Sequence, residues 1–362
     1  MDYEEIIRRN QPLVPIRPLG KGSYGCVYLA HSSEFGIIAV KIVEKDKYEK
    51  REVDSQIELW ENGKGNVFIL KYIACFDEYS FPFIITEYAN MKTLNVIVKH
   101  PQIHLPSYTL RALMKQICME TFLNSKFLFF IYFSKVLGMK SFHASGLIHR
   151  DIKCDNILLH SPSGSGRVHV KISDFGFAKK VDLINEQTYL AGTIPFMAPE
   201  LFQKQSLSTQ KVDIYAVGIT FLRLLRLKYP VNERNFKEQG EKITSMKSIE
   251  RPSEIKDDLL WNLLSKLLEF DPNKRITAAE ALNNPYFASL EAIADISKEQ
   301  QDLAQLAIKA EKDGDSNITE FDKDPSCIAA ESVIKQFVLT DMKENQFKLQ
   351  KLEEFEKNLI II

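Results

Sequence analysis

The stretch GLIHRDIKCDNILLH, residues 146–160, places four polar side chains at fixed spacing among apolar residues. They belong to Arg150, Asp151, Lys153 and Asn156. Such a stretch is either a loop that performs chemistry or a polar loop without chemical function in which His149 packs into the core. The other motifs of the chain decide between these two interpretations.

The composition predicts a globular enzyme or binding protein. A chain of 362 residues is long enough for a sizeable core in one large or two closely joined domains. Its 45% hydrophobic and 26% charged residues are typical of soluble globular proteins. The formal net charge of -1 gives no overall field that favours nucleic acid or an anionic membrane, so we expect no nucleic-acid partner.

The cysteines and the N-terminus indicate a reducing compartment. The five cysteines are widely scattered and form no CxxC pair, which argues against a disulfide framework and against a zinc site. The opening residues MDYEEIIRRN lack the apolar segment of a signal peptide. We therefore expect a cytoplasmic protein without a transmembrane segment.

The first 90 residues predict a small β lobe with one helix. Three short β runs joined by glycine-bearing turns come first, the last of them from Ile37 to Val43. The charged segment from Lys45 to Glu61 has a helical pattern, and two further apolar runs, FILKYIACF and FPFIITEYA, are typical of a hairpin. The expected result is an antiparallel sheet of five strands that ends near Asn90.

The rest of the chain predicts a larger, mostly α lobe followed by a tail. Amphipathic helical patterns occur in SYTLRALMKQI, KVDIYAVGITFLRLLR and DDLLWNLLSKLLEF. After about Tyr286 the composition becomes polar and charged, which predicts a weakly packed, partly helical or disordered tail. The fold class is thus α+β, with lobes over about 15–90 and 91–290 and a tail over 291–362.

The segment GKGSYGCV places Gly20, Gly22 and Gly25 at G-x-G-x-x-G spacing. Glycines allow a tight turn and let backbone N–H groups approach phosphate oxygens. The spacing alone also occurs in ordinary turns and in dinucleotide sites, but a dinucleotide site needs a helix after the loop. Here another β run follows, which favours a hairpin over phosphates.

Two more charged residues stand beside apolar strands. Lys41 lies in IIAVKIV; alone it could be an edge-strand lysine in solvent, but with the glycine loop it predicts a phosphate ligand. A carboxylate must then hold it, and the following helix offers Glu52, which we favour, or Glu58. Asp174 of DFG follows the strand-like VHVKIS, which suits Mg²⁺ that bridges phosphates.

The opening stretch supplies the remaining chemistry. Asp151 can accept the proton of a hydroxyl that is being phosphorylated or orient that hydroxyl. Lys153 can neutralise the charge that is transferred, and Asn156 can bind a second metal ion. Together, the four motifs in this order favour working chemistry over a polar loop.

The set GKGSYGCV, AVK, HRDIKCDN, DFG and GTIPFMAPE resembles the eukaryotic-type protein kinase family over roughly residues 15–290. HRDIKCDN and GTIPFMAPE are similar to the serine/threonine branch. The resemblance implies a bilobal fold with ATP in the cleft, and transfer of a phosphoryl group to serine or threonine of protein substrates.

The resemblance also assigns roles to individual positions. It implies Asp151, Lys153 and Lys41 as catalytic residues and Asn156 and Asp174 as Mg²⁺ ligands. The residues expected to contact ATP are Gly20, Lys21, Gly22, Ser23, Gly25, Val27, Ala39, Lys41, Glu52, Glu87, Ala89 and Leu158. Those expected to shape the site are Thr86 as gatekeeper, Thr193 near Asp151, Glu200 paired with Arg275, and Asp213 under the catalytic loop.

Arg150 beside Asp151 suggests control by phosphorylation, because such an arginine can pair with a phosphate on the activation segment. The segment FAKKVDLINEQTYLAG offers Thr188 and Tyr189 to an upstream kinase. The alternative is a short segment that is ordered without phosphate. A second functional class is a kinase-fold scaffold that binds nucleotide without turnover.

The segment CMETFLNSKFLFFIYFSKV interrupts the helix that leads to the catalytic loop in the family. Its apolar run from Phe127 to Phe133 is too short to span a bilayer and too apolar for a surface loop. We interpret residues 118–135 as translated noncoding sequence, with a docking or membrane-touching helix as the alternative. In the tail, KDGDSNITEFD lacks the sixth-position glycine of a calcium loop and is interpreted as a polar linker.

Overall fold

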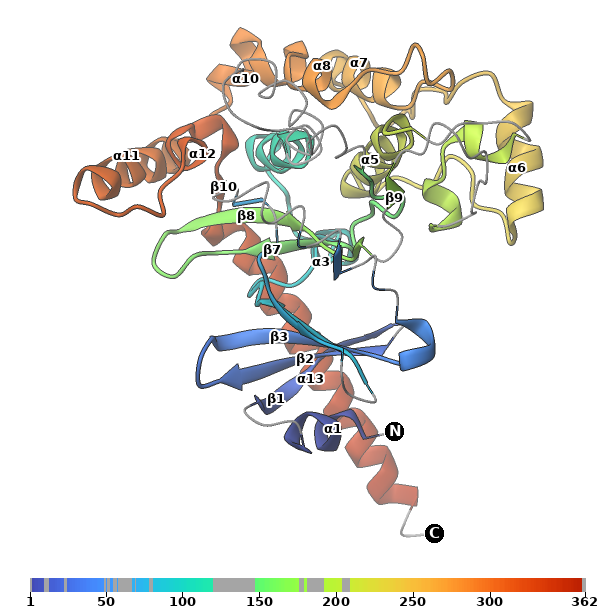
Figure 1. The fold of residues 1–362 in the computed structure, drawn as a ribbon. Coiled ribbons are helices and arrows are strands. Elements are labelled where there is room, and N and C mark those ends of the chain that lie inside the picture. Colours follow the sequence, from blue (N-terminus) through green and yellow to red (C-terminus); the bar gives the residue numbers. More distant parts are fainter. Residues whose placement is uncertain are drawn as a thin grey trace, which may run out of the picture.

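The computed structural model has two lobes joined near Tyr88, with a long C-terminal helix that extends from the larger lobe (Figure 1). The structure describes residues 2–9, 13–22, 25–48, 50, 53–54, 57, 67–68, 70–77, 81–119, 147–175, 179–180, 192–203 and 209–359. Nearly all of the segment that was interpreted as an insert lies outside these residues, so its origin stays a hypothesis.

The small lobe is the predicted antiparallel sheet of five strands, in the order β1-β2-β3-β5-β4. Its strands are β1 (Leu13–Gly22), β2 (Gly25–Ser32), β3 (Gly36–Val43), β4 (Tyr72–Phe76) and β5 (Phe83–Glu87). Side chains alternate between the two faces of a strand. On β3, Ile38, Val40 and Ile42 are fully buried on one face, which leaves Ala39 and Lys41 on the other.

A short N-terminal helix, α1 (Tyr3–Arg9), covers the apolar face of this sheet. Ile7 is fully buried among β-sheet residues, and the hydroxyl of Tyr3 donates to Glu44. The pattern of this segment alone had predicted no regular structure. The helix expected over Lys45–Glu61 is described only in part, by the 3-10 turn η1 (Lys45–Lys47) and by helical residues 50, 53, 54 and 57.

The large lobe is mainly helical, as predicted. Its helices are α3 (Asn95–Lys99), residues 107–119, α5 (Lys211–Leu224), α6 (Phe236–Ser245), α7 (Asp258–Leu267), α8 (Ala278–Leu282), α9 (Pro285–Ala288) and α10 (Leu290–Ala294). Helix α5 is apolar around most of its circumference and is buried over most of its length, as expected of a central helix. Asp257 caps the N-terminus of α7 by accepting from two backbone N–H groups.

Short strands and turns of the large lobe carry the candidate site residues. They are β6 (Leu147–Ile148), β7 (Ile157–His160), β8 (Arg167–Ile172), β9 (Lys179–Lys180), η3 (Ile194–Phe196) and η4 (Pro199–Phe202). β7 pairs with β8 and β6 with β9, all antiparallel. Asn156 therefore stands just before β7, and Asp174 just after β8, at the same end of the β7–β8 hairpin.

The C-terminal tail is more tightly packed than its polar composition predicted. Its elements are α11 (Lys298–Lys312), α12 (Glu320–Lys323), η5 (Pro325–Cys327), β10 (Ala329–Ala330) and α13 (Glu331–Leu359). β10 adds a third strand to β7–β8, and Ile334 and Phe337 of α13 are fully buried. The expectation of weak packing was wrong, because a few small and apolar side chains pack these helices against the large lobe. A buried hydrogen bond from Gln300 to the carbonyl of Ile328 also stabilises the tail.

Candidate functional site

The catalytic-loop candidates form one hydrogen-bonded cluster around Asp151, which is only 3% exposed. Lys153 Nζ donates to Asp151 Oδ2 at 2.7 Å and to the hydroxyl of Thr193 at 2.7 Å. Thr193 donates to Asp151 Oδ1 through its N–H at 3.0 Å and through its hydroxyl at 2.7 Å. Asn156 Nδ2 donates to Asp151 Oδ2 at 2.8 Å. The carboxylate is thus held in one orientation by three neighbours.

Asp213 supports this loop from the core, as predicted. Its carboxylate accepts from the backbone N–H groups of His149, at 2.7 Å, and Arg150, at 2.8 Å. Burial raises the pKa of Asp213, and the two N–H groups and the ring of His149 partly offset that effect. Arg150 has a φ of 66°, and such a backbone conformation persists only where the surroundings fix it.

Gly192 lies against the backbone of the same loop. Its φ is +115°, and a Cβ atom there would lie 2.4 Å from the carbonyl oxygen of Arg150. Only glycine permits both this conformation and this close approach. The approach brings the following residue, Thr193, to Asp151.

Asp174 stands two residues after the end of β8 and points to Lys41 of the small lobe. Its Oδ1 lies 3.2 Å from Lys41 Nζ, so the predicted metal ligand and the predicted phosphate ligand meet across the cleft. Burial alone would raise the pKa of Asp174, but the charge and hydrogen bond of Lys41 outweigh it and hold the pKa below its ordinary value. The carboxylate is therefore ionised at neutral pH.

His149 and Phe175 form the apolar support of this turn. Their rings pack with centroids 4.9 Å apart, and His149 Nε2 lies 3.1 Å from the carbonyl oxygen of Ser173. The structure therefore agrees with a structural role for His149. The hydroxyl of Ser173 donates to the backbone carbonyl of Asn156 at 3.0 Å, which ties the two candidate metal ligands together.

The donor set in the cleft suits Mg²⁺. A divalent magnesium ion takes a few oxygen ligands from the protein and completes its shell with water and phosphate oxygens. Asp174 supplies an ionised carboxylate, and Asn156 uses Nδ2 for Asp151, so its Oδ1 is the atom that can face a cation. Within the described ranges no group of three or more histidine, cysteine, aspartate or glutamate side chains is arranged to hold a metal ion by itself.

The glycine-rich segment is a hairpin, as predicted, because Gly20 pairs with Val27 and Gly22 with Gly25. Gly25 has a φ of +151°, and a Cβ atom there would lie 1.8 Å from the carbonyl oxygen of Ile42. Glycine at this position lets the hairpin lie against β3. Lys21 pairs with Cys26 in the same hairpin.

The candidate adenine site lies between this hairpin and β5. Val27 pairs with Lys41, and Ala39 pairs with Thr86, so these residues lie on neighbouring strands. The N–H of Glu87 donates to the carbonyl of Lys71, and the Glu87 carbonyl accepts from the hydroxyl of Thr86 at 3.2 Å. A carbonyl oxygen has two lone pairs, so it can accept from a base as well. Ala89 follows in the linker between the lobes, and Leu158 of β7 forms an isolated bridge with Thr93 beneath it.

Sequence reasoning missed the side-chain contacts of Glu87. Its Oε1 accepts from the N–H of Lys71 at 2.7 Å and from Lys171 Nζ at 2.6 Å. The signal was a lone lysine in the otherwise apolar strand VHVKIS. The predicted pair of Glu200 with Arg275 is present and bidentate, with distances of 2.6 and 2.8 Å.

Several predicted residues lie outside the described part of the chain. They are Ser23, Glu52, Glu58, Thr188 and Tyr189. The choice between the two glutamates and phosphorylation of the activation segment therefore stay predictions. In the described part of the chain, no helix combines the length and apolar character that crossing a membrane requires.

Comparison with known proteins gives a family match and related kinases. Residues 13–287 match the family model of the protein kinase domain. Serine/threonine-protein kinase STE20 of Candida glabrata is 29% identical over 295 residues, which cover 80% of this chain and 28% of the relative. Serine/threonine-protein kinase ULK3 of Xenopus laevis is 29% identical over 279 residues, covering 75% of this chain and 54% of the relative. The chain thus spans about a quarter to a half of these relatives.

Proposed function

The chain belongs to the protein kinase family, and from this premise we propose that the protein transfers the γ-phosphoryl group of Mg·ATP to serine and threonine hydroxyls of protein substrates. The observation that carries the proposal is the cluster in which Asp151 is held by Lys153, Asn156 and Thr193. The motifs for phosphate, metal and base occur together in one cleft. No observation favours a scaffold without turnover.

In the proposed reaction, Asp151 orients the substrate hydroxyl and accepts its proton. The hydroxyl oxygen forms a bond to the γ-phosphorus while the bond from that phosphorus to the bridging oxygen of ADP breaks. Lys153, now 2.7 Å from Asp151 Oδ2, neutralises the charge on the transferred group. The hydroxyl of Thr193 lies beside both groups, at the place where a substrate hydroxyl enters.

The other half of the cleft positions ATP. Lys41 binds the α- and β-phosphates, and its present contact with Asp174 keeps its ammonium group in the cleft. Asp174 and Asn156 would hold Mg²⁺, which would offset the negative charge of the phosphates and of the group in transfer. The glycine hairpin covers the phosphates, and the backbone of Glu87 and Ala89 pairs with adenine.

We also propose the finer points that the motifs suggest. An upstream kinase acts at Thr188 or Tyr189, and Arg150 receives the phosphate. The protein works in cytoplasmic signalling. Support for a reducing compartment comes from the five cysteines, all of them free and four of them buried.

The test is a transfer assay with γ-labelled Mg·ATP and a protein mixture that offers serine, threonine and tyrosine. Acid hydrolysis of the products should release labelled phosphoserine and phosphothreonine. Phosphotyrosine as the main product would contradict the assigned branch. Absence of all label, from protein that binds ATP, would contradict the proposed function.

A further inference from the structure

The tail helix α12 contacts two segments that both reach Glu87, the first residue of the hinge, which is the linker of residues 87–89 between the lobes. Its Phe321 ring packs on Phe68, with centroids 5.0 Å apart, and Phe68 in turn packs edge-on against His169 of β8. Phe68 is 1% exposed and lies just before β4 of the small lobe. One turn of the tail therefore holds the segment before β4 against β8.

Asp322 makes the polar half of this contact. Its carboxylate, 1% exposed, accepts from His169 Nε2 at 2.9 Å and from the N–H and hydroxyl of Thr319. Arg167 Nε lies 2.9 Å from Asp322 Oδ1, close enough for an ion pair although not in hydrogen-bond geometry. A buried carboxylate with this many partners fixes the position of α12 on β8.

Both clamped segments lead to the same carboxylate in the hinge. Three residues after Phe68, Lys71 donates its N–H to Glu87 Oε1, and two residues after His169, Lys171 donates to the same oxygen. Lys171 Nζ is well buried, since its side chain is 6% exposed. The two supports of Glu87 thus belong to the two segments that α12 holds together.

We propose that Phe321 and Asp322 are positioning residues for ATP, which act through Phe68 and His169 to hold Glu87 where its backbone meets adenine. This inference rests on the proposed function, because it uses the hinge as the adenine site. None of these residues has a hydrogen bond or ion pair with Asp151, Lys153 or Thr193 in the described structure. Their loss therefore weakens ATP binding and leaves the chemical step unchanged.

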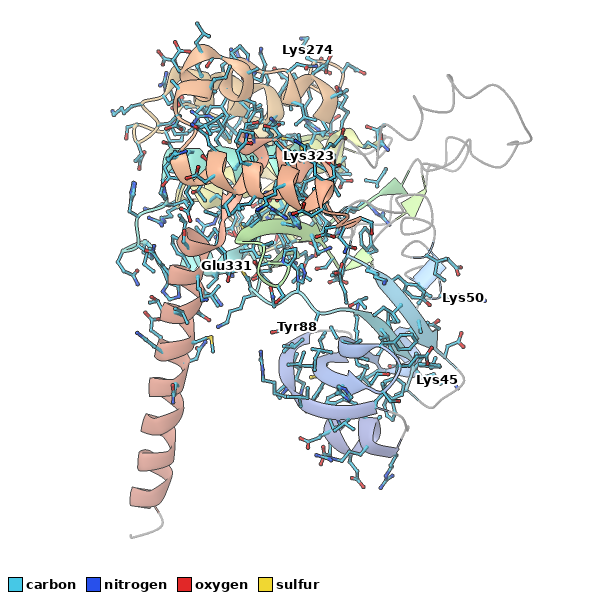
Figure 2. All side chains as sticks on the ribbon, turned by 90° about the vertical axis from the view of Figure 1, so that its left-hand side faces the viewer. Lys45, Lys50, Tyr88, Lys274, Lys323 and Glu331 are labelled. Carbon is cyan, nitrogen blue, oxygen red and sulfur yellow. The ribbon has the colours of Figure 1, made fainter. Side chains whose placement is uncertain are left out.

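Because coupling between two binding equilibria is reciprocal, ATP should also affect the docking of α12. If docking of α12 favours ATP binding, ATP binding favours docking of α12 by the same factor. Figure 2 labels Lys323, the last residue of α12, on the large lobe, and Tyr88 at the hinge. The coupling between α12 and the hinge therefore acts through β8 and the segment before β4.

The first experiment measures binding of a non-hydrolysable ATP analogue with Mg²⁺ to the full chain by calorimetry. Phe321→Ala and Asp322→Asn should each raise Kd about three- to tenfold, the factor expected for loss of one aromatic or charged contact. Glu320→Gln, at an exposed carboxylate in the same helix, should leave Kd unchanged. An unchanged Kd in folded Phe321→Ala and Asp322→Asn overturns the proposal.

Kinetics and amide exchange separate this proposal from the proposed function. In a transfer assay the two variants should raise the KM for ATP by the same factor, with kcat within about twofold of wild type. A fall in kcat with unchanged KM contradicts the positioning role. In the wild-type chain, the ATP analogue should slow amide exchange over residues 319–323, and no slowing there also overturns the proposal, whether or not transfer occurs.

Discussion

At the scale of single residues, the account depends most on Asp151. Its two oxygens are held by Lys153, Asn156 and Thr193, so its replacement by asparagine keeps the size of the side chain and removes the base. We expect Asp151→Asn to lower kcat about 10²- to 10⁴-fold. Steady-state kinetics measure this change, and calorimetry should show little change in ATP affinity. A variant with near wild-type kcat would exclude Asp151 as the base.

Gly25 permits a second prediction at this scale. A Cβ atom there would collide with the carbonyl of Ile42, whereas one at Gly22 in the same hairpin meets nothing within 4 Å. Gly25→Ala should lower the free energy of unfolding by about 1–3 kcal/mol, and Gly22→Ala by clearly less. Urea unfolding of the two variants makes the comparison. Equal losses would show that the close approach of Gly25 does not matter.

The residue scale also shows what the sequence could reveal about the site. Asp151, Lys153, Asn156, Asp174 and Lys41 stand in short motifs, because phosphoryl transfer needs those groups on a few adjacent loops. The contact of Lys171 with Glu87 joins residues 84 positions apart. The sequence shows that Lys171 is an unusual residue in an apolar strand, but it does not identify Glu87 as its partner. Only the folded chain brings the two side chains together.

At the scale of elements, the buried pair of Glu200 and Arg275 anchors the segment around η4 to the lobe. Arg275 has a fully buried side chain and Glu200 one that is 5% exposed. Removal of one partner leaves a buried charge alone, so Arg275→Ala should lower the free energy of unfolding by about 3–5 kcal/mol. Lys274→Ala, beside it but mostly exposed, is the matched control. Thermal unfolding that shifts equally for both would contradict the prediction.

Elements with a clear local pattern were predictable. The five strands follow alternation and glycine turns, and the apolar α5 follows its helical pattern. The packing of α11–α13 was not predictable, because a few buried apolar side chains act there together with polar contacts to residues distant in sequence, such as Asp322 with His169 and Lys92 with Asp341. The composition shows that these residues are polar, but it does not identify their contact partners on the large lobe.

At the scale of the whole molecule, the tail packs against the large lobe, and its last helix, α13, extends away from that lobe (Figure 1). Three of its aspartates, Asp322, Asp324 and Asp341, contact basic side chains of the large lobe, namely His169, Lys115 and Lys92. Burial would raise the pKa of each, but the contact with His169 at Asp322 and with Lys92 at Asp341 outweighs it and lowers the pKa. At Asp324 the hydrogen bond from Ser326, followed by the charge of Lys115, has the same effect. All three carboxylates are therefore ionised at neutral pH.

This arrangement predicts loss of stability in acid. An aspartate whose pKa is lower in the folded state stabilises the fold above its unfolded pKa of about 4, and this contribution is lost as pH falls below that value. Urea unfolding should show that the free energy of unfolding falls between pH 7 and pH 3. This fall should be smaller in the triple variant Asp322→Asn, Asp324→Asn and Asp341→Asn than in wild type. An equal fall in the free energy of unfolding of wild type and variant would mean that these three aspartates do not cause the loss of stability in acid.

The central claim is that one cleft, built from Lys41, Asp151, Asn156 and Asp174, transfers phosphate. The most direct measurement is the initial rate of γ-phosphate transfer from labelled Mg·ATP to protein, for wild type and Asp174→Ala side by side. We expect steady transfer by wild type and a loss of at least about 10²-fold in the variant, since the carboxylate for the metal is gone. Equal rates in both proteins, or no transfer by folded wild type that binds ATP, would contradict this claim.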